Sequence, residues 1–216
     1  MNLISKALLP LLLTLSFNIS ADDHIPQAPY LFPLETMQCN FNENKDMDDL
    51  MKLQGEWKKF IEGNDEISYA AWVITPLYRS ASDFTNDIAW LGASPSWTAF
   101  GKGYQAWFEE AGRLAEKFND VYTCDTRQMF ATQSIRQSEN TSDNGVMLVS
   151  NCSLINDATL MDVAAADQKW NAYLDSQNSD GSILRWYPGP GTPTDLDYSF
   201  KYVQTCLLYT SPSPRD

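Results

Sequence analysis

The sequence predicts an α+β protein built from two modules of the same design, the second of them incomplete. Stretches of alternating apolar residues are interleaved with stretches of helical periodicity, so strands and helices succeed one another along the chain. Apolar residues make up 44% of the 216 residues and aromatic residues 12%, which is enough to fill packed cores. Two segments also match at a constant offset, with identical residues at Cys39/Cys152, Asp49/Asp162 and Trp57/Trp170.

The first module, predicted over 34–137, begins with a strand and a helix. Leu34 to Asn42 alternates loosely between apolar and polar residues, which is typical of a strand. Asp46 to Glu62 places its apolar residues three or four apart, as a helix does. Asp46 is the expected N-cap, and Gly63 with the following Asn is a signal for the helix end.

Two strands, a long helix and a last strand complete the first module. Tyr69 to Tyr78 is rich in β-branched and aromatic residues, and Asp87 to Ala93 predicts a second, shorter strand. Ser94 and Pro95 favour a helix start, and the apolar periodicity then continues to Phe118, weakened near Gly101 and Gly103. The last strand is expected within 121–135. The resulting order is βαββαβ.

The second module, predicted over 146–205, repeats the first half of this order. It has a strand after 146, a helix after the N-cap Thr159, and strands at Ile183 to Tyr187 and Tyr198 to Gln204. The final segment, Cys206 to Asp216, matches letter for letter the translation of adapter DNA used for sequencing libraries. We therefore interpret 206–216 as an artefactual tail and expect the second module to be truncated before its second helix and last strand.

The N-terminus is typical of an export signal. Lys6 precedes the apolar run Ala7 to Phe17, and small residues lead to a cleavage site after Ala21. The run is too short for a bilayer span, which needs about 20 residues. We expect an exported, periplasmic or secreted protein without a membrane span, with three non-modular segments: a signal peptide at 1–21, an N-terminal tail at 22–33 and a linker at 138–145.

Charge and composition exclude several partners and site types. The formal net charge is −13 at pH 7, which disfavours nucleic acid as a partner because phosphate backbones repel an acidic surface. The only histidine, His24, lies in the expected tail, so no catalytic histidine is predicted in the modules. The acidic run Glu43 to Asp49 lacks the glycine and glutamate of a calcium loop and is better explained by helix capping. We expect no metal and no cofactor.

The order βαββαβ is that of the ferredoxin-like plan. A pair of such modules in one chain resembles the dimeric α/β-barrel superfamily, which includes small cofactor-independent monooxygenases and related stress-response proteins. The chain is also similar to uncharacterised secreted bacterial proteins with two such modules. The resemblance implies a monooxygenase or isomerase. Those monooxygenases often use a histidine or an Asn–Trp pair, and neither occurs at matching positions in the first module, so the catalytic residues stay unknown.

Aromatic residues crowd the first module. Core packing explains them, and so does an apolar pocket between the sheet and the second helix, with a carboxylate as polar anchor. The candidate ligand-binding residues are Trp72, Tyr78, Asp87, Trp90 and Tyr104. Three hypotheses follow: an exported protein that binds a small apolar or aromatic ligand, which we favour; a cofactor-independent monooxygenase or isomerase; and a structural or interaction protein of the cell envelope.

One disulfide follows from the ferredoxin-like strand order, in which the fourth strand lies antiparallel beside the first. Cys39 falls near the end of the first strand and Cys124 near the start of the fourth, so the two should be bridged. Cys152, which matches Cys39, would have its partner in the missing part. Tyr69 to Tyr78 is apolar on both faces, so we expect modules 1 and 2 to pack on each other.

Overall fold

The computed structural model describes residues 29–78, 84–138 and 145–206, whose strands form one seven-stranded antiparallel sheet. The strand order is β2-β3-β1-β4-β6-β7-β5. The first module contributes β1 (Leu31–Phe41), β2 (Ala70–Ile74), β3 (Ile88–Ala93) and β4 (Tyr122–Arg136). The second contributes β5 (Val146–Cys152), β6 (Gly181–Pro188) and β7 (Phe200–Cys206). The predicted signal peptide lies outside the described residues.

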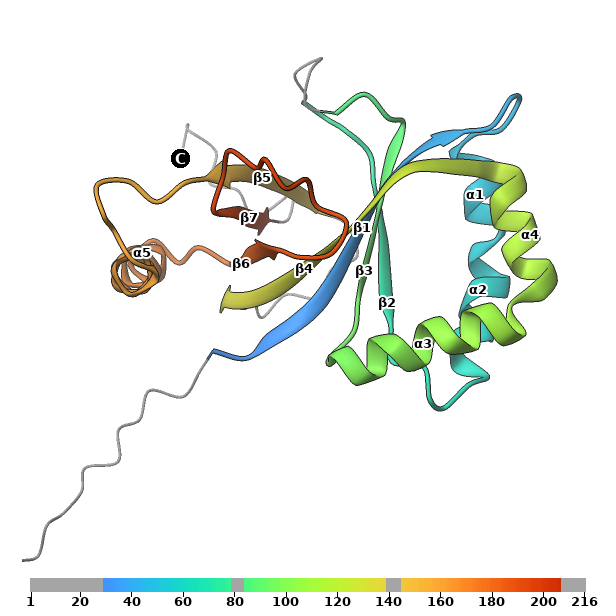
Figure 1. Ribbon diagram of the computed structural model, residues 1–216, viewed down its shortest axis with the longest axis horizontal. Helices are drawn as coiled ribbons and strands as arrows, with labels where there is room; N and C mark the ends of the chain where they lie inside the picture. The colour runs from blue at the N-terminus through green and yellow to red at the C-terminus, as the bar shows by residue number, and fades with distance from the viewer. Residues whose placement is uncertain (1–28, 79–83, 139–144, 207–216) are drawn as a thin grey trace, which may run out of the picture.

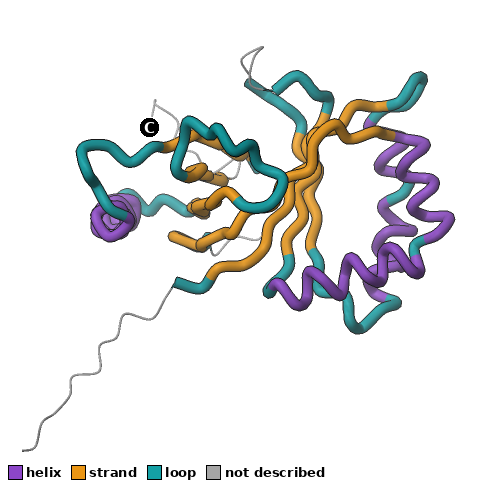
Figure 2. The backbone as a smooth tube through the Cα atoms, in the orientation of Figure 1, coloured by secondary structure: helices purple, strands orange, loops and turns teal. Residues whose placement is uncertain are grey.

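The predicted fold class, α+β with ferredoxin-like modules, is confirmed. The first module has the expected order β2-β3-β1-β4, and β5, β6 and β7 adopt the corresponding order in the second. The modules are joined edge to edge, because β4 pairs with β1 along one side and with β6 along the other. Figures 1 and 2 show the helices of the first module on one side of its strands and the strands of the second module on the other. Among the described residues, no helix is long and apolar enough to cross a membrane.

Several element boundaries differ from the prediction. β1 begins at Leu31, inside the expected N-terminal tail, and β7 includes Cys206, which pairs with Val146 and Gly181. The helix predicted over 46–62 is divided into two, α1 (Met47–Lys52) and α2 (Gln54–Glu62).

The long helix predicted after Ser94 is also divided, into α3 (Trp97–Glu110) and α4 (Gly112–Val121). It breaks at Gly112, whose φ of +38° suits glycine, and not near Gly101 and Gly103, which lie within α3. It also starts later than predicted, because Ser96 Oγ accepts a hydrogen bond from the Ala99 backbone N–H and is the N-cap. The second module has one described helix, α5 (Leu160–Ser176), capped by Thr159 as predicted.

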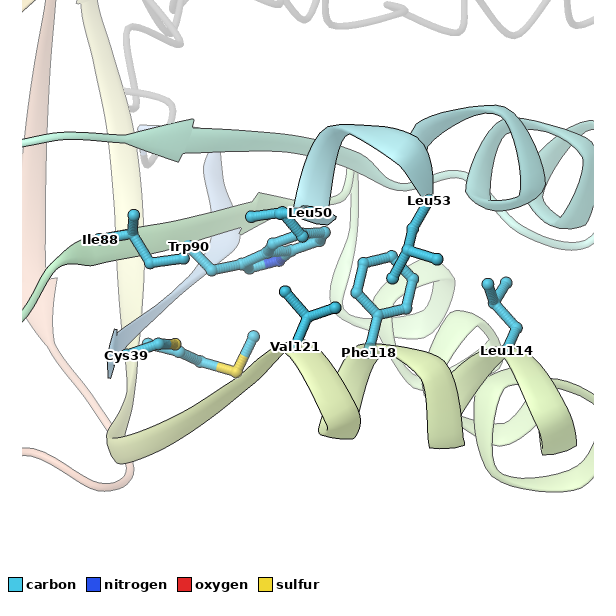
Figure 3. Packing of buried hydrophobic residues seen from close by; sticks show 9 residues of the cluster. Cys39, Leu50, Leu53, Ile88, Trp90, Leu114, Phe118 and Val121 are labelled. Carbon is cyan, nitrogen blue, oxygen red and sulfur yellow. The ribbon is translucent and has the colours of Figure 1, made fainter. Parts of the chain in front are cut away.

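The main core lies between the first module's sheet and its helices. Figure 3 shows Ile88 and Trp90 of β3 facing Leu50 of α1 and Phe118 and Val121 of α4. The predicted disulfide is present at the edge of this core. It joins Cys39 to Cys124, which are partners in the β1–β4 register with their Cα atoms 3.9 Å apart. The bridge therefore ties the start of β4 to the end of β1.

A second core lies on the opposite face of the sheet and contains residues of both modules. Leu34, Leu91 and Phe130 of the first module pack with Trp186 and Val203 of the second. The helices cover the other face of the first module's strands, so β1 and β3 have buried residues on both faces, whereas Trp72 of β2 is 45% exposed. The helix-facing side holds a large cavity that is lined by aromatic side chains.

Candidate active site

A cavity of about 480 Å³ lies between the first module's sheet and its helices. Its aromatic walls come from α2, with Trp57 and Phe60, from α3, with Trp107, and from α4, with Phe118. Their rings meet edge to face, with centroids 5.6 Å apart for Trp57 and Trp107 and 6.0 Å apart for Trp57 and Phe118. The volume lies within the range of small-molecule sites, roughly 300–1,000 Å³.

Glu35 of β1 is the carboxylate of this cavity. Strand alternation places it on the helix-facing side of the sheet together with Met37, and its side chain is 2% exposed. Its Oε1 accepts a hydrogen bond of 2.6 Å from the Tyr69 hydroxyl, and its Oε2 accepts one from the Tyr104 hydroxyl. Trp90 Nε1 in turn donates to the Tyr69 hydroxyl at 3.0 Å. The carboxylate is thus held from both sides.

Gly92 makes this arrangement possible. It lies directly opposite Glu35 in the β1–β3 register, and the phenol of Tyr69 passes over it to reach the carboxylate. A Cβ atom at position 92 would lie 1.7 Å from the Tyr69 hydroxyl oxygen and 2.3 Å from its Cζ. A glycine inside a strand often marks such a close approach.

The tyrosines around Glu35 remain protonated donors. Burial, and next the negative charge of Glu35, raise the pKa of Tyr69 and of Tyr104 well above the usual range. Burial also raises the pKa of Tyr122, at the start of β4, to about 12, although the nearby positive charge of Arg127 acts in the opposite direction. All three phenols therefore carry their proton at neutral pH.

Arg127 of β4 is the only basic residue among those that line the cavity. It lies opposite Met37 in the β1–β4 register, and its Nε donates to the Met37 sulfur at 3.1 Å. Its guanidinium carbon is 5.8 Å from the centroid of the Tyr104 ring. Within the described ranges, no carboxylate lies at ion-pair distance from Arg127, and its side chain is exposed. The cavity therefore combines a buried carboxylate with an exposed guanidinium.

The structure brings two of the five predicted ligand-binding residues to the cavity, Trp90 and Tyr104. Trp72 is 45% exposed and pairs with Leu91, so it lies on the opposite face of the sheet. Tyr78 follows the end of β2 and is 93% exposed. Asp87 precedes β3, where its Oδ2 accepts a hydrogen bond from a backbone N–H of β1. Ligand binding by Trp90 and Tyr104 stays a prediction.

Sequence reasoning missed Glu35, Tyr69 and Arg127. One signal was available for Glu35, because it is a charged residue inside an apolar strand segment, LFPLETMQC. A second was Gly92 inside a short apolar strand. Nothing in the sequence indicated that these two positions lie opposite each other, because that follows from the register of β1 and β3.

Several solved structures resemble this fold. A candidate monooxygenase from Lactobacillus acidophilus NCFM has a TM-score of 0.50 at 10% identity, over 82% of this chain and 77% of that one. A chlorite dismutase variant from Candidatus Nitrospira defluvii has a TM-score of 0.46 at 9% identity, over 81% and 76%. A heme-binding protein from Thermus thermophilus has a TM-score of 0.44 at 8% identity, over 82% and 80%. No family model and no curated protein matches the sequence.

The lining of the cavity corrects the expectation about the partner, which was a small apolar ligand. The cavity gives the physical reason, because its wall carries the carboxylate of Glu35 and the guanidinium of Arg127. A guest without polar groups would pair with neither of them, whereas a guest with an anionic group can pair with the exposed guanidinium. A generic apolar ligand is therefore the wrong partner class.

The similarity to the Lactobacillus protein extends over both modules, since it covers 82% of the chain. At 10% identity it concerns the fold and does not carry over any residue role. The chain shares its fold with proteins of the ferredoxin-like, dimeric α/β-barrel type.

Proposed function

We propose that this chain is an enzyme of the cofactor-independent monooxygenase or isomerase type, with its active site in the cavity of the first module. Both reaction types begin when a base removes a proton from a carbon atom of the substrate. We assign this step to Glu35. The observation that carries the proposal is a carboxylate only 2% exposed at the wall of a cavity of about 480 Å³. A titratable group that is buried in a cavity beside specific partners is a candidate general base.

The geometry suits proton transfer. Each oxygen of Glu35 accepts one tyrosine hydrogen bond and keeps a further lone pair, so the carboxylate can accept a proton without losing its supports. Tyr69 and Tyr104 fix its position, which a general base needs because proton transfer requires hydrogen-bond distance. Their raised pKa values keep both phenols as donors throughout the reaction.

The two reaction types differ only after this first step. In an isomerase, the protonated Glu35 returns its proton to a different atom of the substrate, and no oxidant is needed. In an oxygenase, the carbanion transfers its electron pair to O₂, and the peroxide takes up the proton from Glu35. The hydroperoxide then loses water, which leaves one oxygen atom on the substrate carbon, so the net monooxygenase reaction at a CH₂ group is R₂CH₂ + O₂ → R₂C=O + H₂O. The cavity and the base are the same in both cases.

The lining of this cavity does not fit heme, although one similar structure is named for heme binding. Heme iron is held by histidine, cysteine thiolate, methionine or tyrosinate. No histidine lines the cavity, and Cys124 is bridged to Cys39. The hydroxyls of Tyr69 and Tyr104 donate to Glu35, and the raised pKa values of these two phenols and of Tyr122, which also lines the cavity, oppose tyrosinate formation. Met37 already accepts a hydrogen bond from Arg127. We therefore assign no reaction step to heme.

Proton exchange on a model ketone tests the proposal. 2-Tetralone carries acidic C–H groups next to its carbonyl, and their exchange in D₂O is followed by NMR. The wild-type protein should accelerate this exchange, and Glu35→Gln should lower the acceleration by about a hundredfold or more, because general bases contribute about 10²–10⁴. The control Glu43→Gln changes an exposed carboxylate and should have no effect.

Oxygen consumption in the same reaction separates the two reaction types. Uptake of O₂ that depends on Glu35 indicates an oxygenase, and proton exchange without uptake indicates an isomerase. Equal exchange rates in the wild type and in Glu35→Gln would contradict the proposal. Equal rates because neither protein accelerates the exchange would favour a structural role for the first module.

A further inference from the structure

We infer that the substrates of this cavity are flat aromatic acids, whose anionic group is bound by Arg127. The inference rests on the proposed function of the same cavity and adds the substrate class and its orientation. It starts from a guanidinium with unused donors. Five N–H groups are available on an arginine, and the described part of the chain uses only the Nε of Arg127, in its bond to Met37. The remaining N–H groups match the two oxygens of a carboxylate.

Among the residues that the structure describes, Arg127 lacks an acidic partner, whereas Lys102 near the cavity and Arg185 in the core each have one. Lys102 near the cavity pairs with Glu66 at 2.9 Å, and the buried Arg185 pairs with Asp167 at 2.8 Å. Arg127 has no such partner within the described ranges, although acidic residues outnumber basic ones by 28 to 15 in the sequence. A guanidinium without an acidic partner at a cavity is suited to an anion that comes with the ligand.

The aromatic lining of the cavity favours a flat aromatic ring. The side chains of Trp57, Phe60, Trp107 and Phe118 line it, and Phe60 and Trp107 meet edge to face with centroids 5.6 Å apart. Aromatic walls favour an aromatic guest in offset or edge-to-face contact.

Burial sets the orientation of that guest. Arg127 is exposed, whereas Glu35 is buried, so the anionic group stays at the solvent side and the ring enters the cavity. The reacting carbon then lies on the ring side, toward Glu35. This orientation also keeps the anionic group away from the carboxylate, whose charge would repel it.

A loop of the second module holds the strand that carries Arg127. The carbonyl of Pro190 accepts a hydrogen bond from the backbone N–H of Met129 at 2.8 Å. Gly191 has a φ of +81°, and a Cβ atom there would lie 2.3 Å from the backbone oxygen of Arg127. Gly189 similarly approaches the backbone oxygen of Met129. The loop of the second module thus contacts the backbone of β4 at Arg127 and Met129.

Calorimetric titration with two probes of equal shape tests the substrate class. 1-Naphthoate carries a carboxylate, and 1-naphthamide is its neutral counterpart. We expect the wild-type chain to bind naphthoate at least about tenfold more tightly, as one charge-assisted pair provides. Arg127→Gln should remove this preference and Arg127→Lys should restore part of it. The control Arg113→Gln, which removes a cation of α4 outside the cavity, should keep the preference.

The results distinguish a failure of the aromatic-acid inference from a failure of the proposed reaction at Glu35. Equal binding of both probes, no saturable binding of naphthoate, or an equal loss in Arg113→Gln would overturn the aromatic-acid inference. Circular dichroism checks that the Arg127 variants are folded, and Arg127→Lys provides a second variant if the first is not. Glu35→Gln should retain naphthoate binding. If it does so while proton exchange is unaffected, the proposed reaction fails and the anion site stands.

Discussion

Replacing Gly92 by alanine should disrupt the hydrogen bond by which Tyr69 supports Glu35. The new Cβ atom would lie 1.7 Å from the Tyr69 hydroxyl oxygen and 2.3 Å from Cζ, so the phenol has to move away. Two hydrogen bonds then break, one from Tyr69 to Glu35 and one from Trp90 to Tyr69.

The expected cost follows from these two bonds. A hydrogen bond to a charged acceptor contributes about 1.5–3 kcal/mol and a neutral one about 1 kcal/mol. Alanine in a strand recovers about 0.5–1 kcal/mol relative to glycine. The net loss in the free energy of unfolding is therefore about 1.5–3.5 kcal/mol. Proton exchange on 2-tetralone should fall as well, because Glu35 loses one of its two supports.

Guanidinium chloride unfolding measures this cost, with Gly101→Ala as the matched control. Position 101 lies in α3 with no atom within 4 Å of an added Cβ, so alanine there should stabilise the protein by up to about 1 kcal/mol. In a Tyr69→Ala background, Gly92→Ala should cost little, since the clashing ring is gone. A Gly92→Ala protein as stable as the wild type, or the same loss in both backgrounds, would refute the reasoning.

Three further predictions concern the stability of the fold. Replacing Cys39 and Cys124 together by serine should lower the free energy of unfolding by about 4 kcal/mol in the chain-entropy model, since the bridge spans 85 residues; an unchanged denaturation midpoint would contradict this. Asp167→Ala leaves the guanidinium of Arg185, itself 2% exposed, without its partner and should cost about 3–5 kcal/mol, whereas a loss below about 1 kcal/mol would show that water reaches it. The folded-state pKa of Tyr122, about 12, exceeds the unfolded value of about 10, so its contribution to stability is complete below pH 10 and is lost as the pH rises toward 12. Absorbance at 295 nm should accordingly show buried tyrosines that ionise only above pH 10, and ionisation of all tyrosines near pH 10 would refute this.

The fold could be predicted because it depends on patterns that are local in the sequence. Alternation and helical spacing located β1, β3 and the helices, and the ferredoxin-like strand order then brought Cys39 next to Cys124. The helix breaks at Leu53 and Gly112 were missed. Glycines at 101 and 103 are tolerated because α3 is packed on the sheet, and tertiary packing outweighs a weak helix propensity.

The candidate site was predicted only in part because it depends on register. Trp72 and Trp90 both lie in apolar strands, yet Trp72 is partnered by Leu91 and so falls on the other face of the sheet. A shift of one residue exchanges the two faces, and the sequence does not fix it. Glu35 and Arg127 come from strands about ninety residues apart and lie near each other only through the pairing of β1 with β4.

We propose that Glu35 removes a proton from an aromatic acid that Arg127 holds. Phenylpyruvate tests this proposal most directly, because the molecule combines a ring, an exchangeable CH₂ group and a carboxylate. NMR in D₂O follows the exchange of the CH₂ group. We predict that Glu35→Gln lowers kcat by about a hundredfold or more with little change in KM. Arg127→Gln should instead raise KM by about tenfold with kcat nearly unchanged. A Glu35→Gln variant with wild-type kcat would contradict the account.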